Sequence, residues 1–366
     1  MKKWDKEGNI IKYKACLMVH GFMQHPGLDY DETFSLVMHF ETIRVLLAMV
    51  PSKKLRVWQL DVKGVYLNGK LTQAIYMEQP IGFEDGSGLI CLLIKSVYGL
   101  KQARRVWNIE FDDAIQCHEF WALKLDPCIY ILCKGDEFII VTVWVDDLLL
   151  FATMEELIER TKANLEAKWE LTDLGEPVKI IGIEIALGNQ SVMISQKQYL
   201  ESVLQKEGMD CANPVRMPLD SNVTLKPNPD GNVGNRSNLY VRLIGELQFI
   251  ANTIRPDIAH AISKLSAYMA NPTMQHMLVL KWVLRYLLGT KSYRITYGDV
   301  LDYPNHFFGY ADTAFANADK HKSITGYVFK MARGAVTWYS KKQTITVLLS
   351  MEAEYITLLE VGWEAH

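Results

Sequence analysis

A run of hydrophobic residues surrounds two adjacent acids in the middle of the chain. Residues 138–151, FIIVTVWVDDLLLF, place apolar and partly β-branched side chains on both sides of Asp146 and Asp147. No helical period fits this pattern, and strands this apolar are buried and can be joined through a tight turn. The pattern therefore predicts a buried β-hairpin with both carboxylates at its tip.

A second apolar strand carries a single acid. In residues 57–69, VWQLDVKGVYLNG, Asp61 stands in mid-strand, although Asp is depleted in strands. If this strand lies beside the hairpin, Asp61 and Asp146 converge. Three carboxylates can then hold two metal ions about 3.5–4 Å apart, the arrangement that assists phosphoryl displacement. The alternative is that Asp146 and Asp147 are ordinary polar turn residues.

The remaining pattern alternates helices, strands and turns and predicts an α+β chain. Residues 10–19 have β character, and residues 43–50 predict a helix capped by Thr42 and ended by Pro51. Residues 178–187 and 191–195 predict a hairpin that turns at Gly188-Asn189. From residue 96 a glycine-containing turn, in which Gly99 permits a close backbone approach, leads into a helix that reaches about residue 117. Further helices are predicted at 155–169, 197–208, 240–252, 256–270 and 276–288, and from about residue 305 three strands precede a helix.

Composition describes an ordinary globular protein, with 49% hydrophobic and 22% charged residues among 366. The net charge is −3, from 39 Lys and Arg against 42 Asp and Glu, so any nucleic-acid groove must come from local basic patches. The six cysteines form no C-x-x-C pair and are expected to be reduced thiols. With no membrane-length apolar run and no signal peptide, we expect an intracellular protein without a membrane partner.

Several blocks resemble one known family. WVDD at residues 144–147 resembles the (Y/W/F)-x-D-D signature of reverse transcriptases, and QLDVKGVYLNG is similar to the partner motif of copia-type LTR retrotransposons. The similarity continues in family order over nearly the whole chain, through YKACLMVHGFMQHPGLDYDETFS, MEQPIGF, SVYGLKQARRVWN, DPCIY, DLGEPVKIIGIEI, ISQKQYL, RPDIAHAISKLS, LKWVLRYLLGT, GYADTAF, SITGYVF, WYSKKQ and SMEAEY. The chain is therefore identified as resembling a copia-type Pol polyprotein, in its reverse transcriptase region and the start of its RNase H.

The resemblance implies a right-hand polymerase fold with fingers, palm and thumb, followed by a helical connection and a partial RNase H-like unit. The implied domains are 1–188 for fingers and palm, 189–219 for the start of the thumb, 220–238 for a linker, 239–300 for the helical thumb and connection, and 305–366 for an incomplete RNase H-like domain. Relative to the family, the fingers and the RNase H unit are both expected to be truncated.

The resemblance also implies a metal site for nucleotidyl transfer to a primer 3′-hydroxyl. Asp61, Asp146 and the backbone carbonyl of Val62 would hold two Mg²⁺ ions, with Mn²⁺ as a substitute. Because successive strand residues point to opposite faces, Asp146 takes the bridging role and Asp147 a supporting one.

Four further residues are implied in nucleotide binding. Lys14 would meet the triphosphate, Tyr66 would lie under the sugar and exclude a 2′-hydroxyl, and Lys101 with Gln102 would face the template base pair or its phosphates. Each has a plainer alternative, because lysines also protect edge strands and aromatic residues are common in strands. The implied partners are an RNA template, a DNA primer and deoxynucleoside triphosphates.

In the C-terminal segment, Asp312 and Glu352 match two carboxylates of an RNase H metal site. The other acids of that site lie beyond residue 366 in the family, so this unit is predicted to be inactive.

Several positions depart from the family pattern and support a second hypothesis. Cys16 and His39 stand for Arg, Leu36 and Arg104 for Pro, Ala314 for an acid and Phe315 for Trp. These changes and the acidic charge balance would suit an inactive or co-opted retrotransposon remnant that keeps the fold and at most binds nucleic acid. The three candidate catalytic acids are intact, which favours a polymerase.

Overall fold

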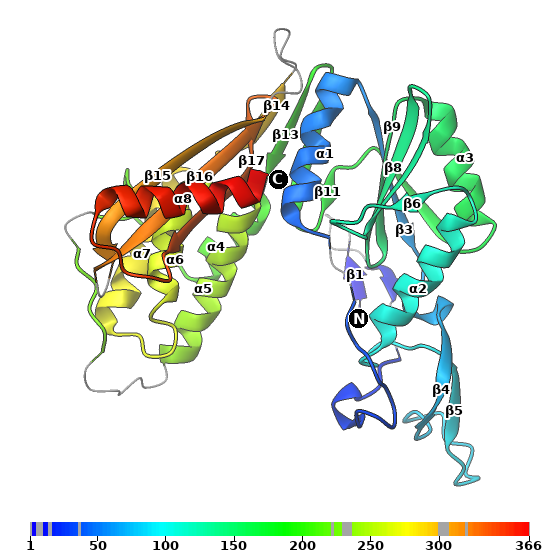
Figure 1. Cartoon of the computed structure of the whole chain (residues 1–366). Coiled ribbons are helices and arrows are strands. Elements are labelled where there is room, and N and C mark those ends of the chain that lie inside the picture. Colours follow the sequence, from blue (N-terminus) through cyan, green and yellow to red (C-terminus); the bar gives the residue numbers. More distant parts are fainter. Residues whose placement is uncertain are drawn as a thin grey trace. The chain divides into compact units, whose positions relative to one another are not determined.

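The chain folds into two compact units, each assembled from two separate stretches of sequence (Figure 1). The computed structural model describes residues 2–4, 10–13, 17–35, 38–220, 223–228, 236–298, 307–318 and 321–365. Unit 1 contains residues 1–39 and 56–176, and unit 2 contains residues 40–55 and 177–366. Throughout the described strands, every pairing between neighbours in a sheet is antiparallel, so the fold is mixed α/β with antiparallel sheets.

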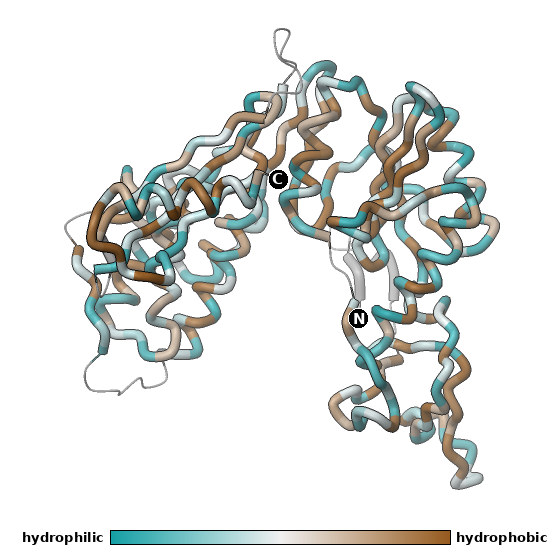
Figure 2. Tube along the Cα trace, viewed as in Figure 1, coloured by the Kyte–Doolittle hydropathy of each residue, from teal (hydrophilic) through white to brown (hydrophobic). Residues whose placement is uncertain are grey.

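Unit 1 is built on a six-stranded sheet with the order β10-β3-β9-β8-β7-β6. Its strands are β3 (Arg56–Val62), β6 (Trp121–Ala122), β7 (Ile129–Lys134), β8 (Glu137–Trp144), β9 (Asp147–Ala152) and β10 (Leu171–Gly175). The central strands β8 and β9 are buried along nearly their whole length and form one of the more hydrophobic stretches of the chain (Figure 2). The predicted hairpin is confirmed, because β8 and β9 pair and Trp144 lies opposite Asp147.

Two helices cover one face of this sheet. They are α2 (Ala103–Gln116) and α3 (Glu155–Glu166), and a 3₁₀ turn, η2 (Val65–Asn68), follows β3. Buried side chains of the two helices, among them Trp107, Phe111, Ile158 and Leu165, form one hydrophobic core with the sheet. This packing fixes α2 against the strands that carry the candidate acids.

The loop before α2 lies against residues 19–21, in a 3₁₀ turn region that includes η1 (Gly21–Met23). The Val19 N–H donates to the Tyr98 carbonyl at 2.9 Å. Gly99 has a φ of +96°, and a Cβ at this residue would collide with the Val19 carbonyl. The close backbone approach predicted at Gly99 is confirmed, and the position requires glycine.

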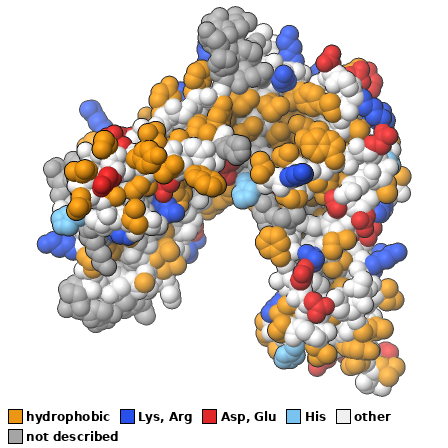
Figure 3. Space-filling view, in the orientation of Figure 1, with side chains coloured by type: hydrophobic (Ala, Val, Ile, Leu, Met, Phe, Trp, Pro, Cys, Tyr) orange, Lys and Arg blue, Asp and Glu red, His pale blue; other side chains and the backbone are white. Residues whose placement is uncertain are grey.

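A two-stranded arm of unit 1 exposes many large apolar side chains. It consists of β4 (Lys70–Met77) and β5 (Cys91–Lys95), with a connecting loop between them. Ile81 and Phe83 in this loop are 95% and 83% exposed, and hydrophobic side chains gather over this part of the surface (Figure 3). At the start of the chain, β1 (Lys2–Trp4) and β2 (Ile10–Tyr13) form a separate pair, so the β character predicted for residues 10–19 is observed as a strand only to Tyr13.

Unit 2 combines a helical core with two sheets. The helical elements are α4 (Lys197–Lys206), α5 (Arg236–Thr253), η3 (Pro256–Ile258), α6 (Ala259–Ser266) and α7 (Met274–Gly289). One sheet has the order β11-β12-β13-β14, formed by β11 (Lys179–Ile180), β12 (Ile183–Gly188), β13 (Ser191–Ser195) and β14 (Ile295–Gly298). The other contains β15 (Phe308–Ala318), β16 (Lys322–Met331) and β17 (Gly334–Lys342), followed by α8 (Ser350–Ala365).

These elements agree closely with the sequence pattern. The β12–β13 hairpin turns after Gly188, the three helices after the linker are present, and three strands precede the last helix. Several helix boundaries were wrong: α5 begins at Arg236, inside the predicted linker, α3 ends at Glu166 rather than residue 169, and α6 ends at Ser266 rather than residue 270. In the described part of the chain no helix is long and apolar enough to cross a membrane, and the cysteines 91, 117, 128, 133 and 211 are free thiols.

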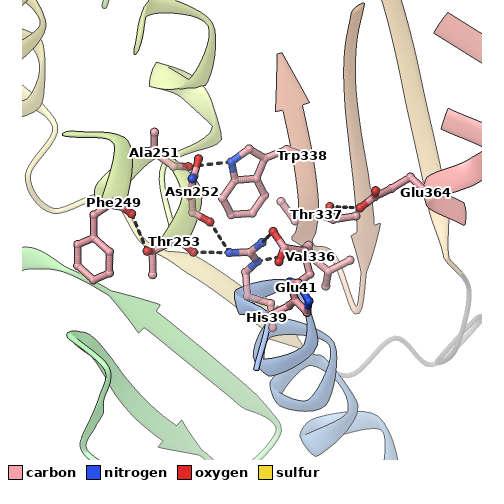
Figure 4. A network of polar contacts seen from close by, with 12 residues as sticks. His39, Glu41, Phe249, Ala251, Asn252, Thr253, Val336, Thr337, Trp338 and Glu364 are labelled. Carbon is pink, nitrogen blue, oxygen red and sulfur yellow. Dashed lines mark hydrogen bonds and ion pairs between the residues drawn. The ribbon is translucent and has the colours of Figure 1, made fainter. Parts of the chain in front are cut away.

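Helix α1 (Phe40–Lys53) belongs to unit 2, although it precedes β3 in the sequence. Its Arg44 is 1% exposed and donates to the carbonyls of Val336, Asn252 and Thr253 and to the Glu41 carboxylate. Figure 4 shows these labelled partners converging from α1, α5 and β17. A buried guanidinium is tolerated only when its donors are satisfied, so α1 is an integral part of unit 2.

The predicted limits of this helix were wrong at both ends. It starts at Phe40 rather than after a Thr42 cap, and it continues through Pro51 to Lys53. Pro51 is buried within the last turn. Tertiary packing therefore overrides the local stop signal that proline gives.

Candidate active site

The turn between β8 and β9 consists of Val145 and Asp146. Val145 has a φ of +56°, in the left-handed region that β-branched residues rarely adopt. The indole N–H of Trp107 donates to the Val145 carbonyl at 2.8 Å, and the N–H of Val62 donates to the Asp146 carbonyl at 2.8 Å. The strained turn is thus held by α2 on one side and by the end of β3 on the other.

Asp61 lies directly across from this turn. Strands β3 and β9 are neighbours, and their register places Asp61 opposite Asp147. Directly opposite residues of an antiparallel pair point to the same face of the sheet. The sequence prediction that the two acidic strands lie side by side is therefore confirmed at the level of the backbone, with Asp61, Asp146 and Asp147 all half-buried.

Burial raises the pKa of the Asp147 carboxyl above its ordinary value, and the charges of Asp146 and Asp61 raise it further. The Gln59 amide opposes this effect by donating to Asp147 Oδ1 at 3.2 Å. Because two of the acids raise the pKa of the third, the three carboxylates repel one another when they are ionised. A cation placed among them would relieve the repulsion.

The donor chemistry of this group suits a hard divalent cation, because Mg²⁺ prefers carboxylate oxygens. Within the described ranges, however, no three His, Cys, Asp or Glu side chains come together as a group that could hold a metal ion. The structure therefore places Asp61 opposite Asp147, next to the turn that contains Asp146, and these side chains do not form a completed ligand set there.

Gln59 and Trp107 are two site residues that the sequence did not single out. Gln59 is 5% exposed and stands two residues before Asp61, on the same face of β3. A polar residue two positions before Asp61 in an apolar strand could have been recognised in the sequence as a candidate partner of the acids. Trp107 offered no such signal, because nothing local shows that its indole reaches a turn 38 residues away.

The two predicted nucleotide-binding residues just before α2 differ in exposure. The Gln102 amide donates to the Asp29 carbonyl and accepts from the Gln24 amide, and only 3% of Gln102 is exposed. Lys101 remains exposed, and its ammonium donates to the Tyr30 hydroxyl at 3.2 Å. Of this pair, Lys101 is therefore the side chain that faces solvent.

Tyr66 lies in η2, four residues after Val62, rather than on a strand. Its ring packs edge-on against Tyr98 with centroids 4.8 Å apart, and it remains half-buried. Tyr66 therefore follows the Asp61 strand closely along the chain. Lys14 lies outside the described residues.

The two candidate RNase H acids occupy neighbouring elements of unit 2. Asp312 is exposed on β15 opposite Gly326, and Glu352 is in the first turn of α8. The Glu352 carboxylate accepts the backbone N–H groups of Leu348 and Leu349 at 3.1 and 3.3 Å. This contact satisfies donors at the start of the helix, which gives Glu352 a capping role.

Comparisons with known proteins show which family the chain resembles over most of its length. Residues 1–221 match the family model described as reverse transcriptase (RNA-dependent DNA polymerase). A retrovirus-related Pol polyprotein from transposon TNT 1-94 of Nicotiana tabacum is 38% identical over 99% of this chain and 28% of its own length. The corresponding polyprotein from transposon RE1 of Arabidopsis thaliana is 34% identical over 99% of this chain and 25% of its own length.

A shorter relative is covered completely. The putative transposon Ty5-1 protein of Saccharomyces cerevisiae is 31% identical over 83% of this chain and 100% of its own length. By contrast, the chain spans only about a quarter of each plant polyprotein that it matches.

Proposed function

The chain belongs to the reverse transcriptase family, with copia-type Pol polyproteins among its relatives, and from this premise we propose that it is an RNA-directed DNA polymerase. One observation carries the proposal: Asp61 faces Asp147 across paired strands, and Asp146 occupies the turn beside them. Placing one acid opposite another in a largely buried sheet destabilises the fold, and such acid pairs are typical of functional sites. Membership in the reverse transcriptase family indicates what that function is.

Reverse transcriptases generally use divalent metal ions such as Mg²⁺. In this chain Asp61, Asp146 and the Val62 carbonyl would hold two such ions, and Asp147 would support them. When bound, the ions would lower the pKa of a primer 3′-hydroxyl and neutralise the triphosphate and the departing pyrophosphate.

The chain's own residues set the geometry around the reacting groups. Gln59 orients the Asp147 carboxylate, and the Val62 N–H anchors the turn through the Asp146 carbonyl. Lys101 is exposed and would meet template or nucleotide phosphates, and Tyr66 is the candidate for excluding a 2′-hydroxyl. The buried position of Gln102 assigns it to supporting the loop before α2.

The finer architecture is also part of the proposal. Unit 1 would supply the fingers and palm, and the β12–β13 hairpin with α4–α7 would supply the primer grip, thumb and connection. The β15–β17 sheet with α8 would be an RNase H-like unit, with Asp312 and Glu352 as its candidate acids and the Glu352 carboxylate capping the helix. An RNA template, a DNA primer and deoxynucleoside triphosphates are the proposed partners.

The decisive experiment is primer extension on an RNA template with Mg²⁺ and deoxynucleoside triphosphates. We expect wild type to extend the primer, and we expect Asp146→Asn and Asp61→Asn each to lower the rate by about 10³-fold or more. Asp136→Asn is the matched control, since it neutralises an exposed acid in the turn at the other end of β8. Equal extension by wild type and Asp146→Asn would reject the assignment, and no incorporation by wild type would make the chain an inactive member of its family.

A further inference from the structure

The β8–β9 turn carries backbone strain next to two of the proposed catalytic acids. Val145 is the residue between Trp144 and Asp146, and its φ of +56° is unfavourable for a β-branched side chain. Such a conformation persists only where the surroundings hold it in place. The contacts of this turn therefore show what maintains it.

Three hydrogen bonds hold the turn and its acids, and each comes from a different position. The Val62 N–H binds the Asp146 carbonyl, and the Gln59 amide binds the Asp147 carboxylate, both from β3. The third donor is the indole of Trp107 on α2, which binds the Val145 carbonyl at 2.8 Å. Among these three, Trp107 is the one that contacts the strained residue itself.

The Val145 carbonyl belongs to the peptide plane that joins Val145 to Asp146. Rotation of this plane changes ψ of Val145 and φ of Asp146, and with them the direction in which the Asp146 side chain leaves the turn. A donor that fixes the carbonyl therefore fixes the aim of the Asp146 carboxylate.

Trp107 is itself held rigidly. Only 1% of its surface is exposed, and its ring packs against Trp169 and Phe111 with centroids 5.1 and 5.6 Å away. Phe111 in turn stacks on Trp169, with an interplanar angle of 11°. An indole with this packing has little rotational freedom, so its N–H is a fixed donor rather than an adaptable one.

We propose that Trp107 is a positioning residue for the carboxylate turn: its indole N–H holds the Val145 carbonyl and thereby orients Asp146 for catalysis. The catalytic part of this inference rests on the proposed polymerase function, whereas its structural part does not. Trp107 touches neither substrate nor metal ligand side chain. It acts through the backbone of the turn.

Amide hydrogen exchange tests the structural part without any assumption about function. The Val62 N–H is protected by the Asp146 carbonyl, and the next amide, Lys63 N–H, is protected by the Glu170 carbonyl of another segment at 3.0 Å. Trp107→Phe keeps an aromatic ring and removes the donor. We expect exchange at Val62 to accelerate about tenfold while exchange at Lys63 changes by less than about twofold.

Trp282→Phe is the matched control, because it likewise removes an indole N–H that donates to a backbone carbonyl, that of Met217, and both residues belong to unit 2. It should leave the ratio of the Val62 and Lys63 exchange rates as in wild type. Equal acceleration at both amides in Trp107→Phe would show general loosening and overturn the inference, as would no acceleration at either. If Trp107→Phe does not fold, wild type alone decides: the indole N–H of Trp107 should exchange slowly, and rapid exchange overturns the inference.

Single-nucleotide incorporation tests the catalytic part. In Trp107→Phe we expect kcat to fall about tenfold and KM for the nucleotide to change less than about threefold, because an acid is misdirected while nucleotide contacts remain. Full kcat in this variant, with an active wild type, would overturn the catalytic role and leave the proposed function standing. An inactive wild type with the expected exchange pattern would instead reject the proposed function and keep the structural role of Trp107.

Discussion

The ionised carboxylate of Asp147 destabilises the folded protein. Its pKa is raised by burial and by two neighbouring acids, while the Gln59 hydrogen bond lowers it. Between the unfolded pKa of 3.8 and the raised folded pKa, the folded protein binds more protons than the unfolded chain. The free energy of unfolding therefore falls as the pH rises through that window.

The first prediction follows from this sign. Asp147→Asn removes the ionisation and leaves a polar side chain for Gln59, so without divalent metal the variant should be more stable than wild type at pH 7. We expect a difference of about 1 kcal/mol that shrinks as the pH falls toward 4. Apparent melting temperatures of the two proteins in EDTA at several pH values measure it. Asp136→Asn, at an exposed position, should show no such pH-dependent gain, and a less stable Asp147→Asn at pH 7 would contradict the electrostatic account.

Individual residues also show which contacts of the site can be predicted from the sequence. The pairing of Asp61 with the hairpin could be predicted because acids inside apolar strands are rare, and the register of β3 with β9 agrees with it. The contribution of Trp107 could not be predicted, since a tryptophan in an amphipathic helix is usually part of a core. Its hydrogen bond depends on how closely α2 approaches the turn, which only tertiary packing determines.

At the scale of elements, Arg44 joins α1 to α5 and β17. Its guanidinium takes carbonyls at the end of α5 and one of β17, and it stacks 4.1 Å from the ring centre of Trp338. Burial lowers the pKa of Arg44, with Glu41 acting in the opposite direction. A guanidinium stays charged under such conditions, so the element contact depends on a buried cation.

The second prediction concerns this contact. Arg44→Ala removes the donor from the buried carbonyls of Val336 and Thr253 and from the carbonyl of Asn252, and we expect unit 2 to lose about 3–5 kcal/mol of stability. Lys53→Ala, at an exposed position on the same helix, should change stability by about 0.5 kcal/mol or less. Urea unfolding followed by circular dichroism compares the two variants. Similar midpoints for both would mean that the Arg44 contacts add nothing to the fold.

Element boundaries show which sequence signals are dependable. The hairpin turn after Gly188 was predicted correctly because its cause is local, and Gly99 was predicted correctly because glycine alone permits the close backbone approach, although the partner there is the distant Val19. The end of α1 at Pro51 was read wrongly because burial of that proline, together with Leu47 and Val50, continues the helix beyond its local stop. Local chemistry predicts turns better than it predicts where a buried helix ends.

At the scale of the molecule, the compact units do not follow the order of the sequence. The predicted fingers and palm form one continuous domain of residues 1–188. In the structure, residues 40–55 belong to unit 2 instead, and unit 1 ends at Glu176. The apolar pattern of residues 43–50 predicts a buried helix and does not say against which partner it packs. Contacts between distant segments decide that question.

The last prediction tests whether unit 2 requires this early helix. Residues 177–366 without α1 would lack the buried side chains of Ile43, Leu46 and Leu47, and the acceptors of Arg44 would lose their donor. Burial of these side chains and the guanidinium contacts should together decide folding, because small units have little stability to spare. We expect the 177–366 fragment alone to bind a hydrophobic dye and unfold without a cooperative transition.

Adding a peptide of residues 40–55 should restore cooperative unfolding, with a midpoint that rises with peptide concentration, since a ligand that binds only the folded state stabilises it by mass action. The same peptide carrying Arg44→Ala is the matched control and should restore much less. A fragment that unfolds cooperatively without any peptide would show that unit 2 does not need α1 in order to fold. Restoration by the wild-type peptide would instead show that the C-terminal half of the chain determines the position of α1, which ends at Lys53, three residues before β3 begins at Arg56.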